Sequence, residues 1–169
     1  MIYAIIRGWL AGMAVLLIEI LLGAILFTPG FPSPPLSTAF AFSISSIICI
    51  ALLEEGLKFL ALRGISGETV PFFRNAIFKG FLIGFGFALF EVCIKILFSS
   101  DTSNGNPLIL GAFSSSLLHI ATGGMLGAAW FSRVKRKPLY IFFSWFFLAF
   151  VAHVFYNAFL APILFNRFS

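Results

Sequence analysis

Charged residues and long polar stretches are scarce in this chain. Only 10% of its 169 residues are Asp, Glu, Lys or Arg, whereas soluble proteins average about 25%. Hydrophobic residues make up 60% of the sequence, and the mean hydropathy is +1.06. No segment is both long and polar enough to form a separate water-soluble domain. We therefore expect a single integral membrane domain over residues 1–169.

Cysteine is also scarce, and the motifs of common hydrolases are absent. Cys49 and Cys93 have no CxxC spacing, so we expect two small buried hydrophobic residues. The chain has no HExxH zinc motif and no GxSxG motif, and the latter argues against a serine hydrolase. The net charge of +5 comes from basic residues in short segments between apolar runs. Such segments act as orientation signals, so nucleic acid is not an expected partner.

Five apolar runs are long enough to cross a bilayer as helices, since one span needs about 20 residues. These runs cover residues 8–28, 37–63, 76–98, 108–131 and 139–165. The expected fold class is therefore all-α, a polytopic membrane bundle of about five transmembrane helices. Lys and Arg gather on one side of these spans, where they include the basic turn at 133–137. The positive-inside rule then predicts a cytoplasmic N-terminus and an external C-terminus.

Two adjacent carboxylates, Glu54 and Glu55, interrupt the second apolar run. A carboxylate inside a membrane helix costs about 2.5 to 3.5 kcal/mol, so such residues usually mark a functional site. Lys58 lies four residues after Glu54 and three after Glu55, and can reach either side chain along a helix. One glutamate can thus be held by an ion pair while the other stays available. A purely structural ion pair would leave one carboxylate without compensation.

Two further glutamates lie on helix faces that also carry glycines. Glu19 shares a face with Gly8 and Gly12, and small residues on such a face let helices approach closely in lipid. We expect this face to contact protein, with Glu19 in a packing or pairing role rather than a catalytic one. Glu91 precedes Lys95 by four residues, a spacing that favours an ion pair. A structural and a catalytic role for Glu91 both remain open.

The last two spans carry the histidines of the chain. His119 lies on one stripe with Ser115 and Gly123, and His153 lies one helical turn before Asn157. Alone, each of these residues would be an ordinary hydrogen-bonded core residue. Counted from the predicted span ends at about 1.5 Å per residue, both histidines and the glutamate pair lie near the middle of the membrane. Their convergence at one level predicts a functional site.

The glutamates, Lys58, the histidines and Asn157 follow one another in an order that resembles the motifs of the PrsW-type intramembrane proteases. More distantly, the chain resembles the CAAX-prenyl-protease and bacteriocin-processing superfamily. The wider superfamily has EExxxR and FxxxH motifs, so Lys58 in place of Arg and Glu91 near the FxxxH position favour the PrsW branch. The matching residues are Glu54-Glu55-Gly56-Leu57-Lys58 for EExxK, Phe90-Glu91 for FE, His119 in the next span, and His153 with Asn157 for HxxxN.

The resemblance implies an intramembrane endopeptidase with a glutamate-activated water. Peptide hydrolysis needs an activated water, a group that polarises the carbonyl and a proton donor for the leaving amine. The resemblance assigns Glu54 as the general base and His119 as a residue that orients the water. Glu55 and Lys58 would maintain the local charge and geometry. His153 and Asn157 would donate hydrogen bonds to the oxyanion.

A zinc-dependent protease at the same site is the alternative. Its ligands would come from Glu54, Glu91, His119 and His153, with a glutamate activating the water. We favour the glutamate mechanism, which needs no cofactor, over the zinc mechanism.

The expected partners are the lipid bilayer and a membrane-anchored protein substrate. The resemblance implies a substrate such as an anti-sigma factor in the plasma membrane of a prokaryote, while the wider superfamily implies a prenylated or lipidated peptide. Buried acids and histidines are also typical of proton-coupled transporters, but the chain lacks the internal repeats that would support one. A non-catalytic membrane scaffold is the remaining alternative.

Overall fold

The structure, a computed structural model, describes residues 1–26, 36–65, 72–98 and 105–166, with the backbone alone at 22–26, 36–43, 98, 105–108 and 164–166. All regular secondary structure in these ranges is helical, so the all-α prediction is confirmed. The helices are α1 (Ile2–Leu26), α2 (Leu36–Arg63), α3 (Phe73–Phe98), α4 (Gly105–Val134), α5 (Leu139–Phe155) and α6 (Ala161–Asn166), with a π-helical turn at Tyr156–Leu160 between the last two.

Four stretches in the described part of the chain are long and apolar enough to cross a membrane. They are Ile2–Leu21, Phe73–Leu97, Ile109–Val134 and Leu139–Ile163. The prediction of five spans is therefore supported for four. The predicted span at 37–63 stays a prediction, because the side chains of residues 36–43 lie outside the described part of the chain. The described side chains of α2 begin at residue 44 and include Glu54, Glu55 and Lys58, so they are too few and too polar to identify a span by themselves. The orientation of the termini stays a prediction.

The helices extend beyond several of the predicted boundaries. α1 begins at Ile2 instead of residue 8, α3 at Phe73 instead of residue 76, and α4 runs from Gly105 to Val134 instead of 108–131. The added residues of α1 are mostly apolar, and Arg7 does not interrupt the helix. In α3 and α4 the backbone hydrogen bonding continues beyond the apolar run that defined the predicted span. The predicted end of the first span, at 28, lies outside the described residues.

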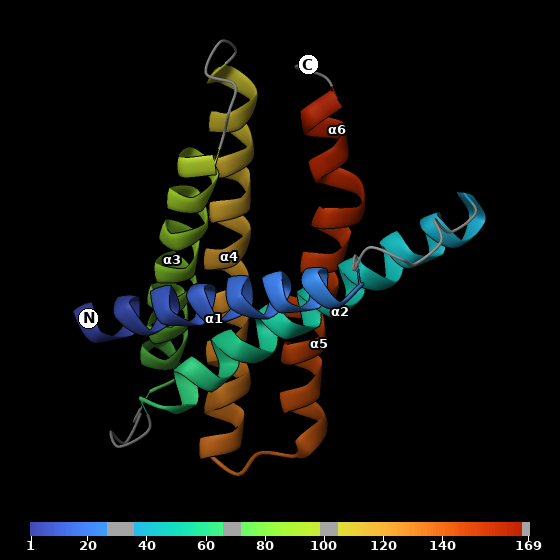
Figure 1. Ribbon diagram of the computed structural model, residues 1–169. Helices are drawn as coiled ribbons and strands as arrows, with labels where there is room; N and C mark the ends of the chain where they lie inside the picture. Colours follow the sequence, from blue (N-terminus) through green and yellow to red (C-terminus); the bar gives the residue numbers. More distant parts are fainter. Residues whose placement is uncertain (27–35, 66–71, 99–104, 167–169) are drawn as a thin grey trace.

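Figure 1 shows how the helices are arranged. α3, α4 and the run from α5 to α6 extend in similar directions, while α1 and α2 cross them in this view. α1 packs mainly on α3, and α2 contacts α4 and α5. The α5–α6 run is continuous because the π turn carries the helical path onward. The second half of α2 is thereby surrounded by the helices that carry the remaining polar residues.

Glycines bring α3 and α4 into backbone contact. A Cβ atom on Gly80 would collide with the backbone of Gly123 and Gly127, and one on Gly84 would collide with the carbonyl group of His119. No larger residue fits these positions without separating the helices. The predicted inward orientation of the His119 stripe is confirmed, because this contact places it directly against α3.

The glycine face of α1 packs on α3 in the same way. A Cβ atom on Gly8 would collide with the backbone carbonyl of Ile83, and one on Gly12 would collide with the ring of Phe90. The prediction that this face contacts protein is confirmed for both glycines. Close approach of small residues is the usual way in which membrane helices associate.

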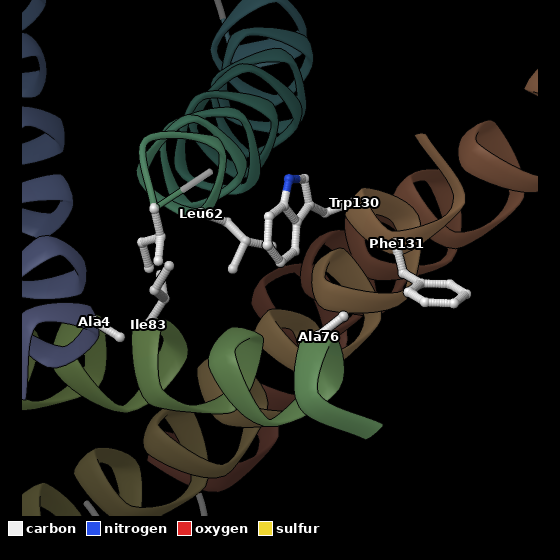
Figure 2. Close-up of a cluster of buried hydrophobic side chains, with 7 residues drawn as sticks. Ala4, Leu62, Ala76, Ile83, Trp130 and Phe131 are labelled. Carbon is white, nitrogen blue, oxygen red and sulfur yellow. The ribbon is translucent and has the colours of Figure 1, made fainter. Parts of the chain in front are cut away.

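An apolar cluster joins the first four helices, and Figure 2 shows it. Trp130, which is only 3% exposed, lies beside Leu62 in this cluster. The buried members are Ala4, Leu62, Ile65, Ala76, Ile83, Trp130 and Phe131.

Large apolar side chains also cover the outside of the bundle, where Leu17 and Phe147 are both well exposed. Apolar side chains on the outer surface are suited to contact with lipid. Cys49 and Cys93 lie on this surface too, so the expectation that they are buried was wrong. In lipid, an apolar run does not distinguish an inward-facing position from an outward-facing one, because both favour hydrophobic residues.

Candidate functional site

Lys58 forms an ion pair with Glu55 inside the bundle. Its Nζ lies 2.5 Å from Glu55 Oε1, and neither side chain is exposed. The same ammonium group lies 3.1 Å from Thr122 Oγ1 and 3.2 Å from His119 Nδ1. A lysine ammonium has three hydrogens to donate, and these three acceptors satisfy them. Of the two adjacent glutamates, Glu55 is thus the one held by the lysine.

Each histidine has a carboxylate at one of its ring nitrogens. His153 Nδ1 lies 2.6 Å from Glu55 Oε1, and His119 Nε2 lies 2.6 Å from Glu91 Oε2. An ionised carboxylate can only accept a hydrogen bond, so these two ring nitrogens are the donors. In a neutral imidazole the other nitrogen then presents a lone pair. These lone pairs are on Nε2 of His153 and on Nδ1 of His119, and the latter accepts from Lys58.

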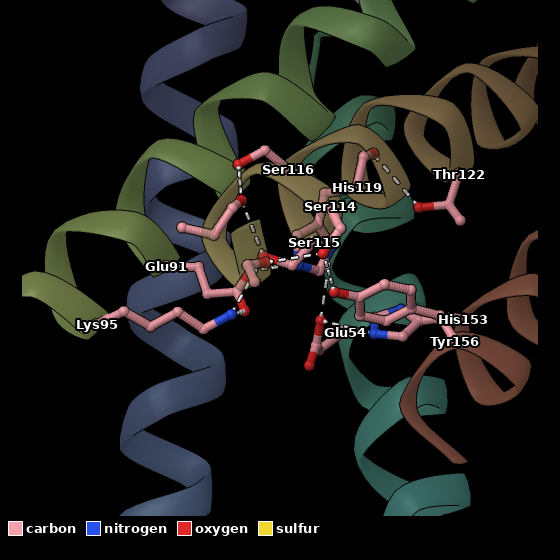
Figure 3. A network of polar contacts seen from close by, with 12 residues as sticks. Glu54, Glu91, Lys95, Ser114, Ser115, Ser116, His119, Thr122, His153 and Tyr156 are labelled. Carbon is pink, nitrogen blue, oxygen red and sulfur yellow. Dashed lines mark hydrogen bonds and ion pairs between the residues drawn. The ribbon is translucent and has the colours of Figure 1, made fainter. Parts of the chain in front are cut away.

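Both of these nitrogens face Glu54, as Figure 3 shows. Glu54 Oε2 lies 3.5 Å from His153 Nε2 and 3.9 Å from His119 Nδ1. This oxygen is buried and has no hydrogen-bond partner among the residues that the structure describes. Three acceptor atoms from α2, α4 and α5 therefore converge. Lys58 already donates to the one on His119, while the other two need a proton, a water molecule or a cation between them.

Glu91 is held from two sides. Its Oε1 lies 2.5 Å from Lys95 Nζ, which confirms the predicted ion pair, and its Oε2 accepts from His119. Lys95 also donates to Ser115 Oγ at 3.1 Å. Both carboxylate oxygens of Glu91 are therefore used, and the residue lies behind His119 rather than beside Glu54. This arrangement fixes the orientation of the His119 ring.

Asn157 is less closely associated with this group than its spacing from His153 predicts. None of the residues that the structure describes hydrogen-bonds to its amide, and it lies in the π turn that follows α5. Its neighbour Tyr156 is buried, and its hydroxyl lies 2.7 Å from Ser114 Oγ. A π turn widens the helix locally and often occurs at functional sites, and here it begins three residues after His153.

A cavity of about 230 Å³ adjoins Glu54 between α1 and α3. Glu19 lines it together with Glu54, Glu91 and Lys95. The sequence placed Glu19 on a face that contacts protein, but it did not predict that this carboxylate and Glu54 share a cavity. The spacing along α1 gave no signal for this, since it depends on where α1 crosses α3.

Two other residues of this polar network, Thr122 and Tyr156, were not predicted from the sequence. Thr122 donates to the carbonyl oxygen of His119 at 3.3 Å, which leaves its own oxygen free to accept from Lys58. Its position three residues after His119 puts it on the same face of α4, and this spacing was an available signal. Tyr156 had no comparable signal, because its contact with Ser114 joins α4 to the π turn.

Three side chains of this group match a metal-binding site in ligand type and spacing. Glu54, His119 and His153 each offer one ligand atom, and these atoms lie within 4.8 Å of one another. Glutamate and histidine are ordinary zinc ligands, and the carboxylates behind both imidazoles match the usual support of metal-bound histidines. The set therefore fits a zinc-like cation, although Lys58 already donates to the His119 nitrogen that would bind it.

Comparison with known proteins gives one match, to a family. A family-wide sequence profile described as "PrsW family intramembrane metalloprotease" matches residues 1–166. No curated protein and no solved structure gives a significant match to the chain.

Proposed function

Because the chain belongs to the PrsW family of intramembrane proteases, we propose that Glu54 activates the water with which this protein hydrolyses peptide bonds of membrane-anchored proteins. The observation that carries the proposal is the buried Glu54 Oε2, which faces both imidazoles and has no hydrogen-bond partner among the described residues. An unpartnered carboxylate oxygen is costly inside a protein, and a bound water would satisfy it.

The first chemical step is attack by this water on the peptide carbonyl. Glu54 takes a proton from the water as the water oxygen bonds to the carbonyl carbon. His153 Nε2 accepts a hydrogen bond from the same water and does not donate to the oxyanion as the resemblance implies, because the ring proton of His153 is on Nδ1, which donates to Glu55. When the carbon–nitrogen bond breaks, Glu54 returns the proton to the leaving amine. Proton transfer by a positioned side chain contributes about 10²- to 10⁴-fold to a rate.

The surrounding residues keep Glu54 and the histidines in place. Lys58 and Glu91 together fix the His119 ring through its two nitrogens, and Glu55 holds the tautomer of His153. The Lys58 charge also stabilises negative charge that develops on the carbonyl oxygen. Asn157 is proposed as a hydrogen-bond donor to this oxygen once substrate is bound.

A metal-dependent mechanism is the second candidate, and the convergence of three ligand atoms within 4.8 Å favours it. Glu54, His119 and His153 would hold the ion, which would polarise a water molecule and the substrate carbonyl. We favour the glutamate mechanism because the Lys58 ammonium lies 3.2 Å from His119 Nδ1. A second cation at this nitrogen would be repelled by it.

The proposal extends to the setting of the reaction. The whole chain, residues 1–169, forms one membrane domain in the plasma membrane of a prokaryote, with its N-terminus in the cytoplasm. The substrate is a membrane-anchored protein of the anti-sigma-factor kind. These statements are supported by the family and by the distribution of basic residues in the sequence.

Cleavage of a panel of single-span substrates by the purified protein in detergent tests the proposal. Glu54→Gln keeps the size of the side chain but removes the base, so cleavage should fall by about 10²-fold or more. His153→Ala should also reduce cleavage strongly. Val151→Ala, an exposed position on the same helix as His153, is the matched control and should leave the rate unchanged. Equal cleavage by wild type and Glu54→Gln would refute the assignment.

A further inference from the structure

The cavity between α1 and α3 carries more negative than positive charge. Glu19, Glu54 and Glu91 line it, and Lys95 is the one basic residue among its lining residues. Its volume of about 230 Å³ is several times the share of one water molecule in liquid water, about 30 Å³. The cavity therefore has room for a side chain of a bound peptide.

The charges in this cavity are not equally compensated. Glu91 has both carboxylate oxygens bonded, to Lys95 and to His119, and Lys95 is bonded to Glu91 and Ser115. Glu19, in contrast, has no hydrogen-bond or ion-pair partner among the residues that the structure describes. Since Lys95 is already used by Glu91, no basic residue that lines the cavity is left for Glu19.

The cavity is continuous with the proposed catalytic group, because Glu54 lies on its wall. The oxygen Oε2 of Glu54 is itself buried and unpartnered among the described residues. A peptide whose scissile carbonyl lies at Glu54 would therefore place a neighbouring side chain in the cavity. A carboxylate in a membrane helix is costly unless it is paired, and a cationic group of the peptide would compensate Glu19.

We propose that this cavity is a specificity site in which Glu19 binds a lysine or arginine side chain of the substrate, close to the cleaved bond. The inference rests on the proposed function and adds a substrate feature to it. The ammonium or guanidinium group would donate to Glu19, while the apolar stem of the side chain would pack against Phe87 and Phe90, which also line the cavity.

The test uses synthetic single-span peptides in which one lysine or one norleucine is moved through the positions around the cleaved bond. Norleucine keeps the unbranched stem of lysine and removes its charge. For wild type, the ratio of kcat/KM between the lysine and norleucine peptides should reach about tenfold at a single position. Glu19→Gln should bring this ratio close to one.

Two further variants sharpen the comparison. Leu17→Gln introduces the same amide on α1 at an exposed position that does not line the cavity, and it should keep the wild-type ratio. Glu19→Lys should reverse the preference, so that a glutamate peptide is cleaved faster than a lysine peptide. A wild-type ratio near one at every position would overturn the inference, while cleavage itself would still support the proposed function.

Binding gives a readout that does not depend on cleavage. The Glu54→Gln protein in nanodiscs should bind the fluorescent lysine peptide about tenfold more tightly than the norleucine peptide. Adding Glu19→Gln to that protein should remove the difference. Equal binding of the two peptides before this addition would overturn the inference, whether or not wild type cleaves them. An inorganic cation in the cavity would likewise give no position-specific preference and would overturn it.

Discussion

Lys58 Nζ lies 2.5 Å from Glu55 Oε1, and both side chains are completely buried. Removing one member of a buried ion pair leaves the other charge without compensation and costs about 3 to 5 kcal/mol. Lys58→Met should therefore lower the free energy of unfolding by an amount in this range, measured by denaturation in mixed detergent micelles.

The double variant Glu55→Gln/Lys58→Met removes both charges, so it should lose less stability than Lys58→Met alone. Lys95→Met is the matched control, because the Lys95–Glu91 pair is partly exposed and such pairs contribute about 0 to 1 kcal/mol. Equal losses for Lys58→Met and Lys95→Met would contradict the structural role given to the buried pair.

The choice between a glutamate and a metal mechanism can be decided by chelation. We expect cleavage to persist after treatment with a zinc chelator, and the purified protein to contain much less than one zinc per chain. Both quantities are measured on the same sample, by a cleavage assay and by elemental analysis. Loss of cleavage on chelation, restored by zinc, would assign the ion to Glu54, His119 and His153. In that case His153→Ala should also reduce the zinc content.

Two glycines of the described chain should respond in opposite ways to alanine. A Cβ on Gly80 collides with the backbone of α4, whereas a Cβ on Gly56 meets no atom within 4 Å. Gly80→Ala should separate α3 from α4, lower the melting temperature and weaken the contact between Glu91 and His119. Gly56→Ala should be tolerated or stabilise the protein by about 0.5 to 1 kcal/mol. If alanine at Gly56 were the more damaging change, the described packing would be wrong.

The hydrogen bond from the π turn to α4 should matter for activity as well as for stability. Tyr156→Phe removes only the hydroxyl that lies 2.7 Å from Ser114 Oγ, at a cost of about 1 kcal/mol. Because Tyr156 follows His153 by three residues, we expect a lower kcat with little change in KM. Tyr140→Phe, on an exposed residue, is the control. A change confined to the melting temperature would show that the bond has only a structural role.

The sequence predicted the helical fold and the convergence of its ionisable residues, because charges in apolar runs are conspicuous. It could not decide whether Lys58 pairs with Glu54 or Glu55, since both lie within reach along one helix turn. That choice depends on His153, which is 98 residues away from Glu55 and binds the same carboxylate oxygen. Such a preference arises only when α5 packs against α2.

Other features depend on geometry that has no local signature. The π turn at Tyr156–Leu160 adds a residue to one helical turn, so the one-turn spacing between His153 and Asn157 does not bring both to the same contacts.

The glycine contacts between α3 and α4 restrict the route by which a substrate can enter. Gly80, Gly84 and Gly123 bring the two backbones together, so an incoming transmembrane segment cannot pass between these helices without breaking their interface. The Glu91–His119 edge of the proposed catalytic group is therefore closed to lateral entry from the lipid. Under the proposed function, a substrate must reach Glu54 from another side of the bundle. A helical segment around the scissile bond must unwind there, because the amides of an intact helix are already hydrogen-bonded.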